Sequence, residues 1–224
     1  TIDGKSYSGT SVSAALTTTI TAATFNGSNV SCFGSTNGSI DLTVAGGTTA
    51  YTYLWTNTAQ TTQDITGLAA NTYSVRVTDL NGCTTTQTIT LTQPAALSTT
   101  ITAATFNGSN VSCFGSSNGS IDLTVAGGTT NYTYLWTNTA QTTQDITGLA
   151  ANTYSVRVTD ANGCITTRTI TLTQPVALTT TVTPFTYAGG YNISCNGLSN
   201  GSIDLTVAGG TTAYTYQWSN LATT

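Results

Sequence analysis

Two long segments of the sequence are almost identical. Residues 13–93 and 94–174 align without a gap and differ at seven of their 81 positions. The differing pairs are Ser13/Pro94, Thr17/Ser98, Thr36/Ser117, Ala50/Asn131, Leu80/Ala161, Thr84/Ile165 and Gln87/Arg168. A third, more divergent copy starts at Pro175 and reaches Thr224. Because this period is longer than the 20–50 residues of a solenoid unit, the repeat predicts a row of small independent domains.

Within each copy, apolar and polar residues alternate as they do in half-buried strands. In residues 39–45, Ile40, Leu42 and Val44 fall on one face, and polar residues fall on the other. Further strands are expected at residues 16–24, 50–56, 72–79 and 84–92. Asn-Gly and Gly-Gly pairs separate these segments and are typical of tight turns, because both residue types tolerate a positive φ.

The fold class that this pattern predicts is all-β. About seven short strands, with one tryptophan on a middle strand, are typical of an immunoglobulin-like β-sandwich. Tyr73, in the sequence GLAANTYSV, fits the tyrosine corner of that fold. We expect one sandwich at residues 13–93, a second at 94–174 and an incomplete third at 175–224, with a leading segment at 1–12 that matches no part of the repeat.

Composition excludes several functions. The net charge is −4, and the four basic residues are scattered, so the chain lacks the basic patch that nucleic acid or an anionic membrane surface requires. No apolar run approaches the roughly 20 residues of a membrane-spanning helix. The sequence has no histidine and no glutamate, which leaves few groups for general acid–base catalysis. We therefore predict no enzyme, no catalytic residues and no cofactor.

The cysteines recur with the repeat. Cys32 and Cys83 are 51 residues apart, and so are Cys113 and Cys164. A metal site would need cysteine or histidine clustered at short spacing, and the chain has no such cluster. We therefore predict the disulfides Cys32–Cys83 and Cys113–Cys164, one inside each domain, each worth about 4 kcal/mol in the chain-entropy model. Disulfides also imply an oxidising location.

The fifth cysteine, Cys195, occupies the place of Cys32 and Cys113 in the third copy. Its partner is then expected 51 residues further on, beyond Thr224. If the chain ends at Thr224, Cys195 is instead a candidate for a bond to another molecule.

Two further sets of side chains invite a functional reading. The aspartates recur as Asp41, Asp64, Asp79, Asp122, Asp145, Asp160 and Asp204. Calcium could bridge domains through such carboxylates, but a β-hairpin by itself explains Asp79 and its neighbours, and no metal ligand is assigned. Tyr51, Tyr53 and Trp55 share one strand face and could stack on sugar rings, although packing in the core is the favoured interpretation.

A long motif links the chain to a known family. The pattern C-x-G-x-x-x-G-x-I-x-L-x-V-x-G-G-T, then Y-x-Y-x-W, then L-x-x-x-x-Y-x-V-x-V-T-D-x-N-G-C and Q-P runs from Cys32 to Pro94. It recurs from Cys113 to Pro175, and the third copy follows it as far as Trp218. This pattern resembles the SprB repeat of very large surface adhesins of gliding Bacteroidota, with a mild departure where Asn and Thr replace the glycine usual before T-Y.

The resemblance implies a segment of an extracellular bacterial filament or adhesin stalk at the cell surface, exported by the type IX secretion route and without catalysis. The expected partners are neighbouring repeats of the same chain, with other filament strands or surface glycans as further candidates. Two alternatives stay open. The repeats could themselves bind a glycan through the Tyr and Trp faces, or the chain could be a subunit of a polymer that a neighbouring chain completes.

Overall fold

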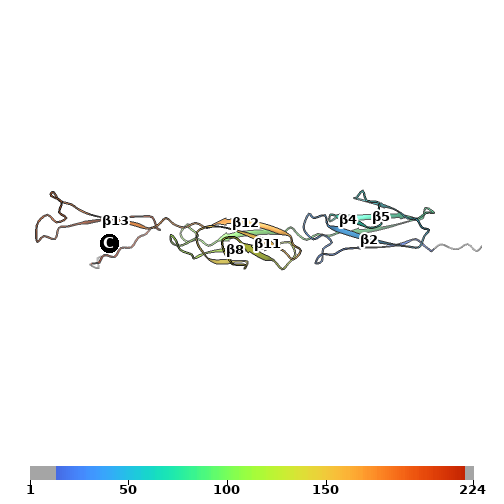
Figure 1. Cartoon of the computed structure of the whole chain (residues 1–224), viewed down its shortest axis with the longest axis horizontal. Helices are drawn as coiled ribbons and strands as arrows, with labels where there is room; N and C mark the ends of the chain where they lie inside the picture. Colours follow the sequence, from blue (N-terminus) through green and yellow to red (C-terminus); the bar gives the residue numbers. More distant parts are fainter. Residues whose placement is uncertain (1–13, 220–224) are drawn as a thin grey trace, which may run out of the picture. The chain divides into compact units, whose positions relative to one another are not determined.

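The computed structural model describes residues 14–219, which form strands, turns and loops (Figure 1). The leading segment predicted at residues 1–12 lies outside the described residues. No helix that could cross a membrane occurs between residues 14 and 219. The all-β prediction is confirmed.

The first repeat is a sandwich of two three-stranded antiparallel sheets. One sheet has the order β1-β2-β4 and consists of β1 (Thr17–Ala22), β2 (Gly38–Ala45) and β4 (Ile65–Leu68). The other has the order β3-β5-β6 and consists of β3 (Thr52–Trp55), β5 (Thr72–Thr78) and β6 (Thr84–Thr90). The immunoglobulin-like sandwich therefore has six strands, where the sequence predicted about seven.

The core of this repeat lies between the two sheets. The first sheet contributes Ile40 and Leu42, and the second contributes Trp55, Val75 and Val77. The inward positions on β2 and β5 are those that the alternation of the sequence predicts. Because successive side chains of a strand point to opposite faces, polar residues of the same strands remain outside.

Strand β4 was not predicted, because its sequence does not alternate. Ile65 and Leu68 are buried, whereas Thr66 and Gly67 between them are exposed. Its pairing with β2 shifts register next to Gly38, as at a β-bulge. A bulge adds a residue on one strand and breaks the two-residue period that sequence patterns rely on.

The second repeat has the same two sheets, in the orders β10-β8-β7 and β12-β11-β9. Its strands are β7 (Ser98–Ala103), β8 (Gly119–Ala126), β9 (Thr133–Trp136), β10 (Ile146–Leu149), β11 (Thr153–Thr159) and β12 (Ile165–Thr171). In the third repeat, the described residues form one sheet of β13 (Thr179–Pro184) and β14 (Ile203–Ala208).

The differences between the first two repeats leave the core unchanged. Leu80 and Ile165, each the larger member of its pair, are more than half exposed. Gln87 and Arg168 make the same hydrogen bond with different side chains. Gln87 Nε2 donates to the carbonyl of Thr18 at 3.1 Å, and Arg168 Nε donates to the carbonyl of Thr99 at 3.0 Å.

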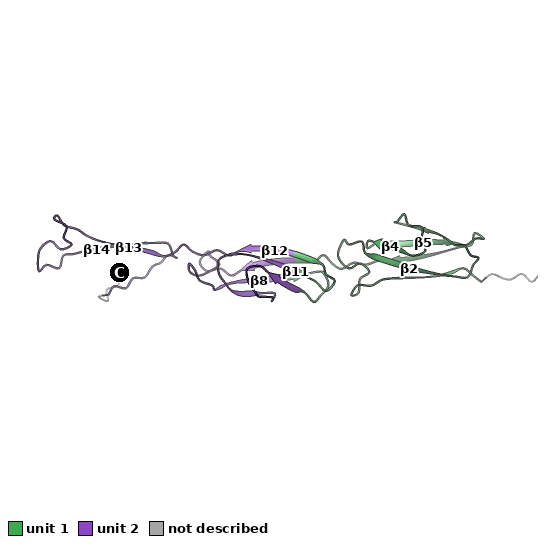
Figure 2. Ribbon diagram, viewed as in Figure 1, with its two compact units in different colours: residues 1–98, 125–132, 158–166 green, residues 99–124, 133–157, 167–224 purple. Residues whose placement is uncertain are grey.

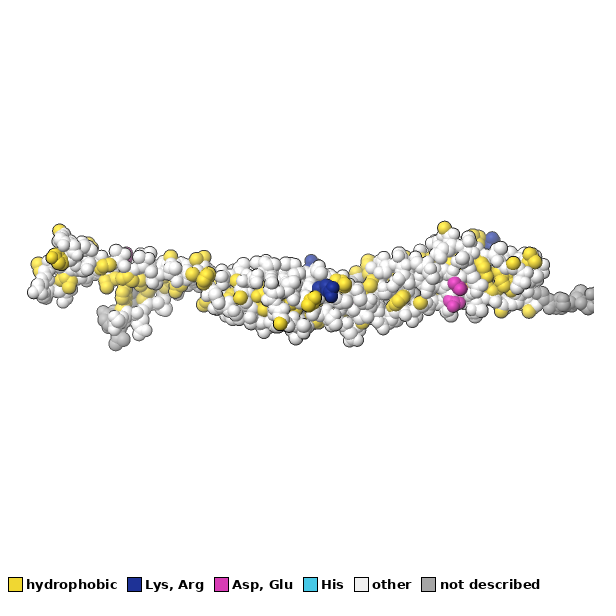
Figure 3. All heavy atoms as spheres, in the orientation of Figure 1, with side chains coloured by type: hydrophobic (Ala, Val, Ile, Leu, Met, Phe, Trp, Pro, Cys, Tyr) yellow, Lys and Arg dark blue, Asp and Glu magenta, His cyan; other side chains and the backbone are white. Residues whose placement is uncertain are grey.

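The chain divides into two compact units whose boundaries do not follow the repeats (Figure 2). Unit 1 holds the described residues up to Ser98 together with Val125–Tyr132 and Val158–Thr166. Unit 2 holds Thr99–Thr124, Thr133–Arg157 and the described residues from Thr167. Two turn regions of the second repeat thus belong to the same unit as the first repeat. On the face drawn in Figure 3, charged side chains are few and isolated.

Candidate functional site: a disulfide between successive repeats

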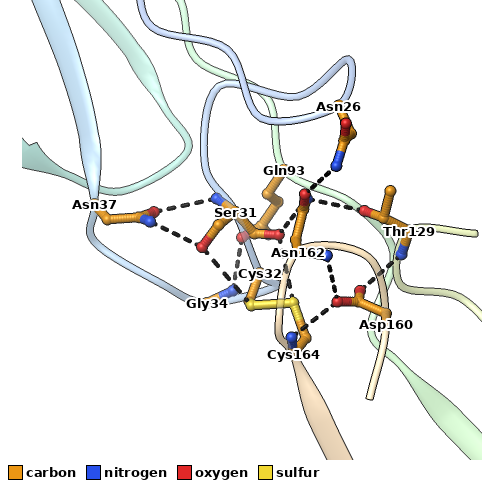
Figure 4. Close-up of a disulfide and its surroundings, with 10 residues drawn as sticks. All are labelled: Asn26, Ser31, Cys32, Gly34, Asn37, Gln93, Thr129, Asp160, Asn162 and Cys164. Carbon is orange, nitrogen blue, oxygen red and sulfur yellow. Dashed lines mark hydrogen bonds between the residues drawn. A yellow bond between two sulfur atoms is a disulfide. The ribbon is translucent and has the colours of Figure 1, made fainter. Parts of the chain in front are cut away.

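The disulfide of unit 1 joins Cys32 of the first repeat to Cys164 of the second (Figure 4). The two residues are 132 positions apart in the sequence, and their Cα atoms are 5.7 Å apart. The other three cysteines, Cys83, Cys113 and Cys195, are free and exposed.

The predicted pairs Cys32–Cys83 and Cys113–Cys164 are therefore wrong, and among residues 14–219 no disulfide joins two cysteines of one repeat. The loop of Cys32 lies where β6 ends, since Val30 N donates to the carbonyl of Thr92 at 3.0 Å. Cys83 lies where β6 begins. A strand of 7 residues spans roughly 24 Å, whereas the Cα atoms of a disulfide lie within about 7 Å. The length of the sandwich keeps the two cysteines of one repeat apart.

Cys195 is exposed and free in the loop that precedes β14. The expectation that its partner lies beyond Thr224 stays a prediction.

Side chains of the first repeat fix the loop that carries Cys32. Ser31 N donates to Asn37 Oδ1 at 3.1 Å, and Asn37 Nδ2 donates back to Ser31 Oγ at 2.8 Å. Gly34 N donates to Gln93 Oε1 at 2.7 Å. These bonds hold the loop at the end of the sandwich, with the carbonyl of Ser31 and the sulfur of Cys32 turned toward the second repeat's hairpin (Figure 4).

Asp160 shapes the hairpin that carries Cys164. The residue is 5% exposed, and Oδ1 accepts from the amides of Asn162 at 2.9 Å and Cys164 at 2.8 Å. Oδ2 accepts from the amide of Thr129 at 2.8 Å. Gly163 adopts a φ of +82°, a left-handed conformation that glycine reaches without strain. The aspartate thus connects the hairpin to the neighbouring turn at Thr129.

Asn162 joins the hairpin to the first repeat beside the disulfide. Its Nδ2 donates to the carbonyl of Ser31 and to Thr129 Oγ1, both at 3.0 Å. Its Oδ1 accepts from Asn26 Nδ2 at 2.6 Å. In Figure 4 its side chain points between these three partners. No bond between repeats was predicted for Asn162 from the sequence. The available signal was that each hairpin cysteine is preceded by Asn-Gly.

The first repeat contains the same hairpin without a repeat bonded to it. Asn81 Nδ2 donates to Thr48 Oγ1 at 2.8 Å, as Asn162 does to Thr129, but Asn81 and Cys83 are exposed. Asp79 accepts from the amides of Thr48, Asn81 and Cys83, at 2.9, 3.0 and 2.8 Å. These bonds, that of Thr48 first, lower the pKa of Asp79 against the opposing effect of burial. The hairpin therefore has its shape before any disulfide forms.

Of the other aspartates, Asp64 and Asp145 also stabilise the fold. Asp64 Oδ1 accepts from the amide of Leu42 at 3.0 Å, and Asp145 Oδ1 accepts from that of Leu123 at 2.9 Å. The copies Asp41, Asp122 and Asp204 point outward from their strands. Among residues 14–219, no three Cys or Asp side chains gather as a metal site would require.

The aromatic residues Tyr51, Tyr53 and Trp55, in and just before β3, pack against the core, as predicted. Trp55 is 4% exposed and donates from Nε1 to the carbonyl of Thr62 at 2.9 Å. Tyr51 and Tyr53 are half-buried against the same core cluster. The tyrosine corner is also confirmed, since the hydroxyl of Tyr73 donates to the carbonyl of Ala69 at 3.0 Å.

These features define a class of protein: a tandem array of immunoglobulin-like β-sandwiches with a covalent bond between successive repeats. Three segments of the chain, residues 24–60, 105–141 and 191–223, match the family model of the SprB repeat. These three segments, 107 of the 224 residues, are similar to the SprB repeat. Each matched segment includes the first cysteine of its repeat, and none includes the hairpin cysteine.

Comparison with solved structures found a likeness to "Structure of amphioxus IgVJ-C2 molecule". The identity is 12%, the match covers 57% of this chain and 91% of that chain, and the TM-score is 0.28. So low a TM-score adds nothing to the fold assignment, which follows from the strand order. No curated protein sequence matched the chain.

Proposed function

We propose that the chain is a structural segment of an extracellular bacterial adhesin or filament, whose repeats form a stalk or fibre for surface attachment and gliding movement. The match of three segments of the chain to the SprB-repeat model supports this proposal. The observation that carries it is the bond between Cys32 and Cys164, because a covalent link between successive repeats transmits load along an array. The proposal includes export by the type IX route to an oxidising exterior.

The position of this bond determines which part of the chain tension can extend. Residues 33–163, which are 131 residues, lie between the bonded cysteines. A force applied at the two ends of the chain passes through the disulfide and leaves these residues off the load path. Fully extended, they would span roughly 470 Å at about 3.6 Å per residue. A stalk built in this way resists lengthening even when a sandwich unfolds.

Single-molecule pulling on the whole chain, held at its two ends, tests this function. Under oxidising conditions the extension should exclude residues 33–163. After reduction of the disulfide, or in a Cys32→Ser variant, it should increase by roughly 470 Å. The Cys83→Ser variant is the matched control, because Cys83 is free, and it should behave as the unaltered chain does.

Two results of the pulling experiment would contradict the proposed function as a stalk. Equal extension of oxidised and reduced chains would mean that no bond protects the repeats from tension. An increase of about 360 Å, in two steps of about 180 Å, would indicate the pairs within each repeat, which enclose 50 residues each. Antibody labelling of intact producing cells tests the location separately, and labelling only after lysis would exclude the cell surface.

The proposal assigns no catalysis and no cofactor, in keeping with a sequence that lacks histidine and glutamate. The alternative of a glycan platform on Tyr51, Tyr53 and Trp55 is not favoured, because these rings face the core. On a glycan array, the unaltered chain and a Tyr53→Ala variant should give the same signals. Binding that is lost in the variant would support the glycan platform. The mass of the native assembly tests the alternative of a polymeric fibre. We expect the mass of a single chain, whereas a polymer of chains would have a multiple of that mass.

A further inference from the structure

The loop around Cys113 in the second repeat has the same internal geometry as the loop around Cys32, but its cysteine is free. Ser112 N donates to Asn118 Oδ1 at 3.1 Å, as Ser31 N does to its own asparagine. Gly115 N donates to Gln174 Oε1 at 2.8 Å, against 2.7 Å in the first repeat. The loop therefore takes this shape without a disulfide.

A pocket of about 270 Å³ opens beside Cys113. It is lined by Asn107, Ser112, Cys113 and Phe114 of the second repeat and, among residues of the third, by Pro175 and Thr211. All of these residues belong to unit 2. Cys113 is exposed there, whereas Cys32 is half-buried.

Residues equivalent to this lining are already in contact with a hairpin in unit 1. The equivalents of Asn107, Ser112, Cys113 and Thr211 are Asn26, Ser31, Cys32 and Thr129. Three of them hydrogen-bond to Asn162, and Cys32 is bonded to Cys164. The pocket thus presents the groups that hold an Asp-x-Asn-Gly-Cys hairpin one repeat earlier.

We propose that the pocket at Cys113 is the receiving site for the Asp-x-Asn-Gly-Cys hairpin of a complete repeat that directly follows the second one. A disulfide between the first cysteine of one repeat and the second cysteine of the next then recurs at every pair of successive repeats. Residues 175–224 contain no such hairpin. This inference goes beyond the proposed function, because it concerns which cysteines pair and not what the array does.

The chemistry is the oxidation of two thiols by a disulfide oxidant, such as glutathione disulfide. The thiolate of one cysteine attacks the oxidant and releases one glutathione thiol, which gives a mixed disulfide. The second cysteine then attacks that mixed disulfide, forms the protein bond and releases the second glutathione thiol. Two protons and two electrons pass from the cysteines to glutathione.

The experiment keeps the full chain and appends to Thr224 a copy of residues 143–174, which completes the third repeat in register with the second. The product is oxidised in a glutathione redox buffer, and its disulfides are mapped by mass spectrometry of non-reduced peptides. We expect the appended cysteine, the copy of Cys164, to be bonded to Cys113. The Cys32–Cys164 bond of the same molecule is the internal control for oxidation, and Cys83 should stay free.

Each possible result of this disulfide mapping either supports the inference or overturns it. A bond from the appended cysteine to Cys195, a bond between chains, or free thiols at both Cys113 and the appended cysteine would overturn the inference. Cys195→Ser should leave the new bond intact, and Cys113→Ser should abolish it. Replacing the appended copy of Asn162 by Ala removes the counterparts of two hydrogen bonds, those of Asn162 to Ser31 and Asn26, and should lower the equilibrium constant for the new bond about 30-fold. No effect of that replacement would exclude the hairpin geometry.

Discussion

The side-chain amide of Asn162 donates to the carbonyl of Ser31 at 3.0 Å, across 131 residues of sequence. Its copy in the first repeat, Asn81, keeps the bond within its own repeat, to Thr48, but contacts no equivalent of Ser31. The two asparagines lie in hairpins whose sequences differ only at Leu80 and Ala161, and the contact with a preceding repeat distinguishes them.

This difference makes Asn81→Ala the matched control for Asn162→Ala. Both variants lose the bond to a threonine hydroxyl, but only Asn162→Ala also loses the bonds to the carbonyl of Ser31 and to Asn26 Nδ2. We expect Asn162→Ala to reduce the free energy of unfolding by about 2 kcal/mol more than Asn81→Ala does, at about 1 kcal/mol for each bond. Denaturant titration of the oxidised proteins measures this, and equal losses would mean that the contact contributes nothing.

Loss of the disulfide should destabilise the chain by an amount that grows with the logarithm of the length of the loop that it closes. For a separation of 132 residues, the chain-entropy model gives about 5 kcal/mol. We expect Cys32→Ser to lower the free energy of unfolding by up to that amount. Cys83→Ser removes a free thiol and should have little effect. If Cys83→Ser were as damaging as Cys32→Ser, the pairing would lie within the repeat.

Neighbouring residues of β3 test the core interpretation of the aromatic face. Trp55 is 4% exposed and Leu54 is 56% exposed. We expect Trp55→Ala to cost about 3–5 kcal/mol of unfolding free energy through lost burial and the cavity that remains. Leu54→Ala should change it by less than about 0.5 kcal/mol. Denaturant midpoints give both values, and a mild effect of Trp55→Ala would reopen the surface-platform interpretation.

The hairpin aspartate predicts a dependence of stability on pH. The amide of Thr48 and the amides of Cys83 and Asn81 lower the pKa of Asp79 in the folded chain. The charged carboxylate therefore contributes stability fully above its unfolded pKa of about 4, and loses it as the pH falls through the lower folded value.

Urea midpoints at pH 7 and pH 3 check this prediction. Asp79→Asn should be less stable than the unaltered chain at pH 7, and its midpoint should fall less between the two pH values. Asp41→Asn removes an outward-facing carboxylate and serves as the control. A fall in midpoint as large for Asp79→Asn as for the unaltered chain would contradict the assignment.

The sequence alone determined most of the sandwich. Its alternation placed Ile40 and Leu42 inside, and the position of Tyr73 indicated the corner at Ala69. These features could be predicted because burial of a strand face follows a two-residue period. Strand β4 was not predicted because a bulge interrupts that period between Ile65 and Leu68.

Only the tertiary structure decided how the cysteines pair. In a repeating sequence, each first cysteine is followed by a second cysteine in its own repeat and by an equivalent one in the next, so spacing does not choose between Cys83 and Cys164. The antiparallel strands settle the choice. They place Cys32 and Cys83 at the two ends of β6, roughly 24 Å apart along the strand, while the hairpin of the next repeat lies against Ser31. The Cα atoms of a disulfide lie within about 7 Å of each other. Cys32 can therefore bond to Cys164, whose Cα atom is 5.7 Å away, but not to Cys83.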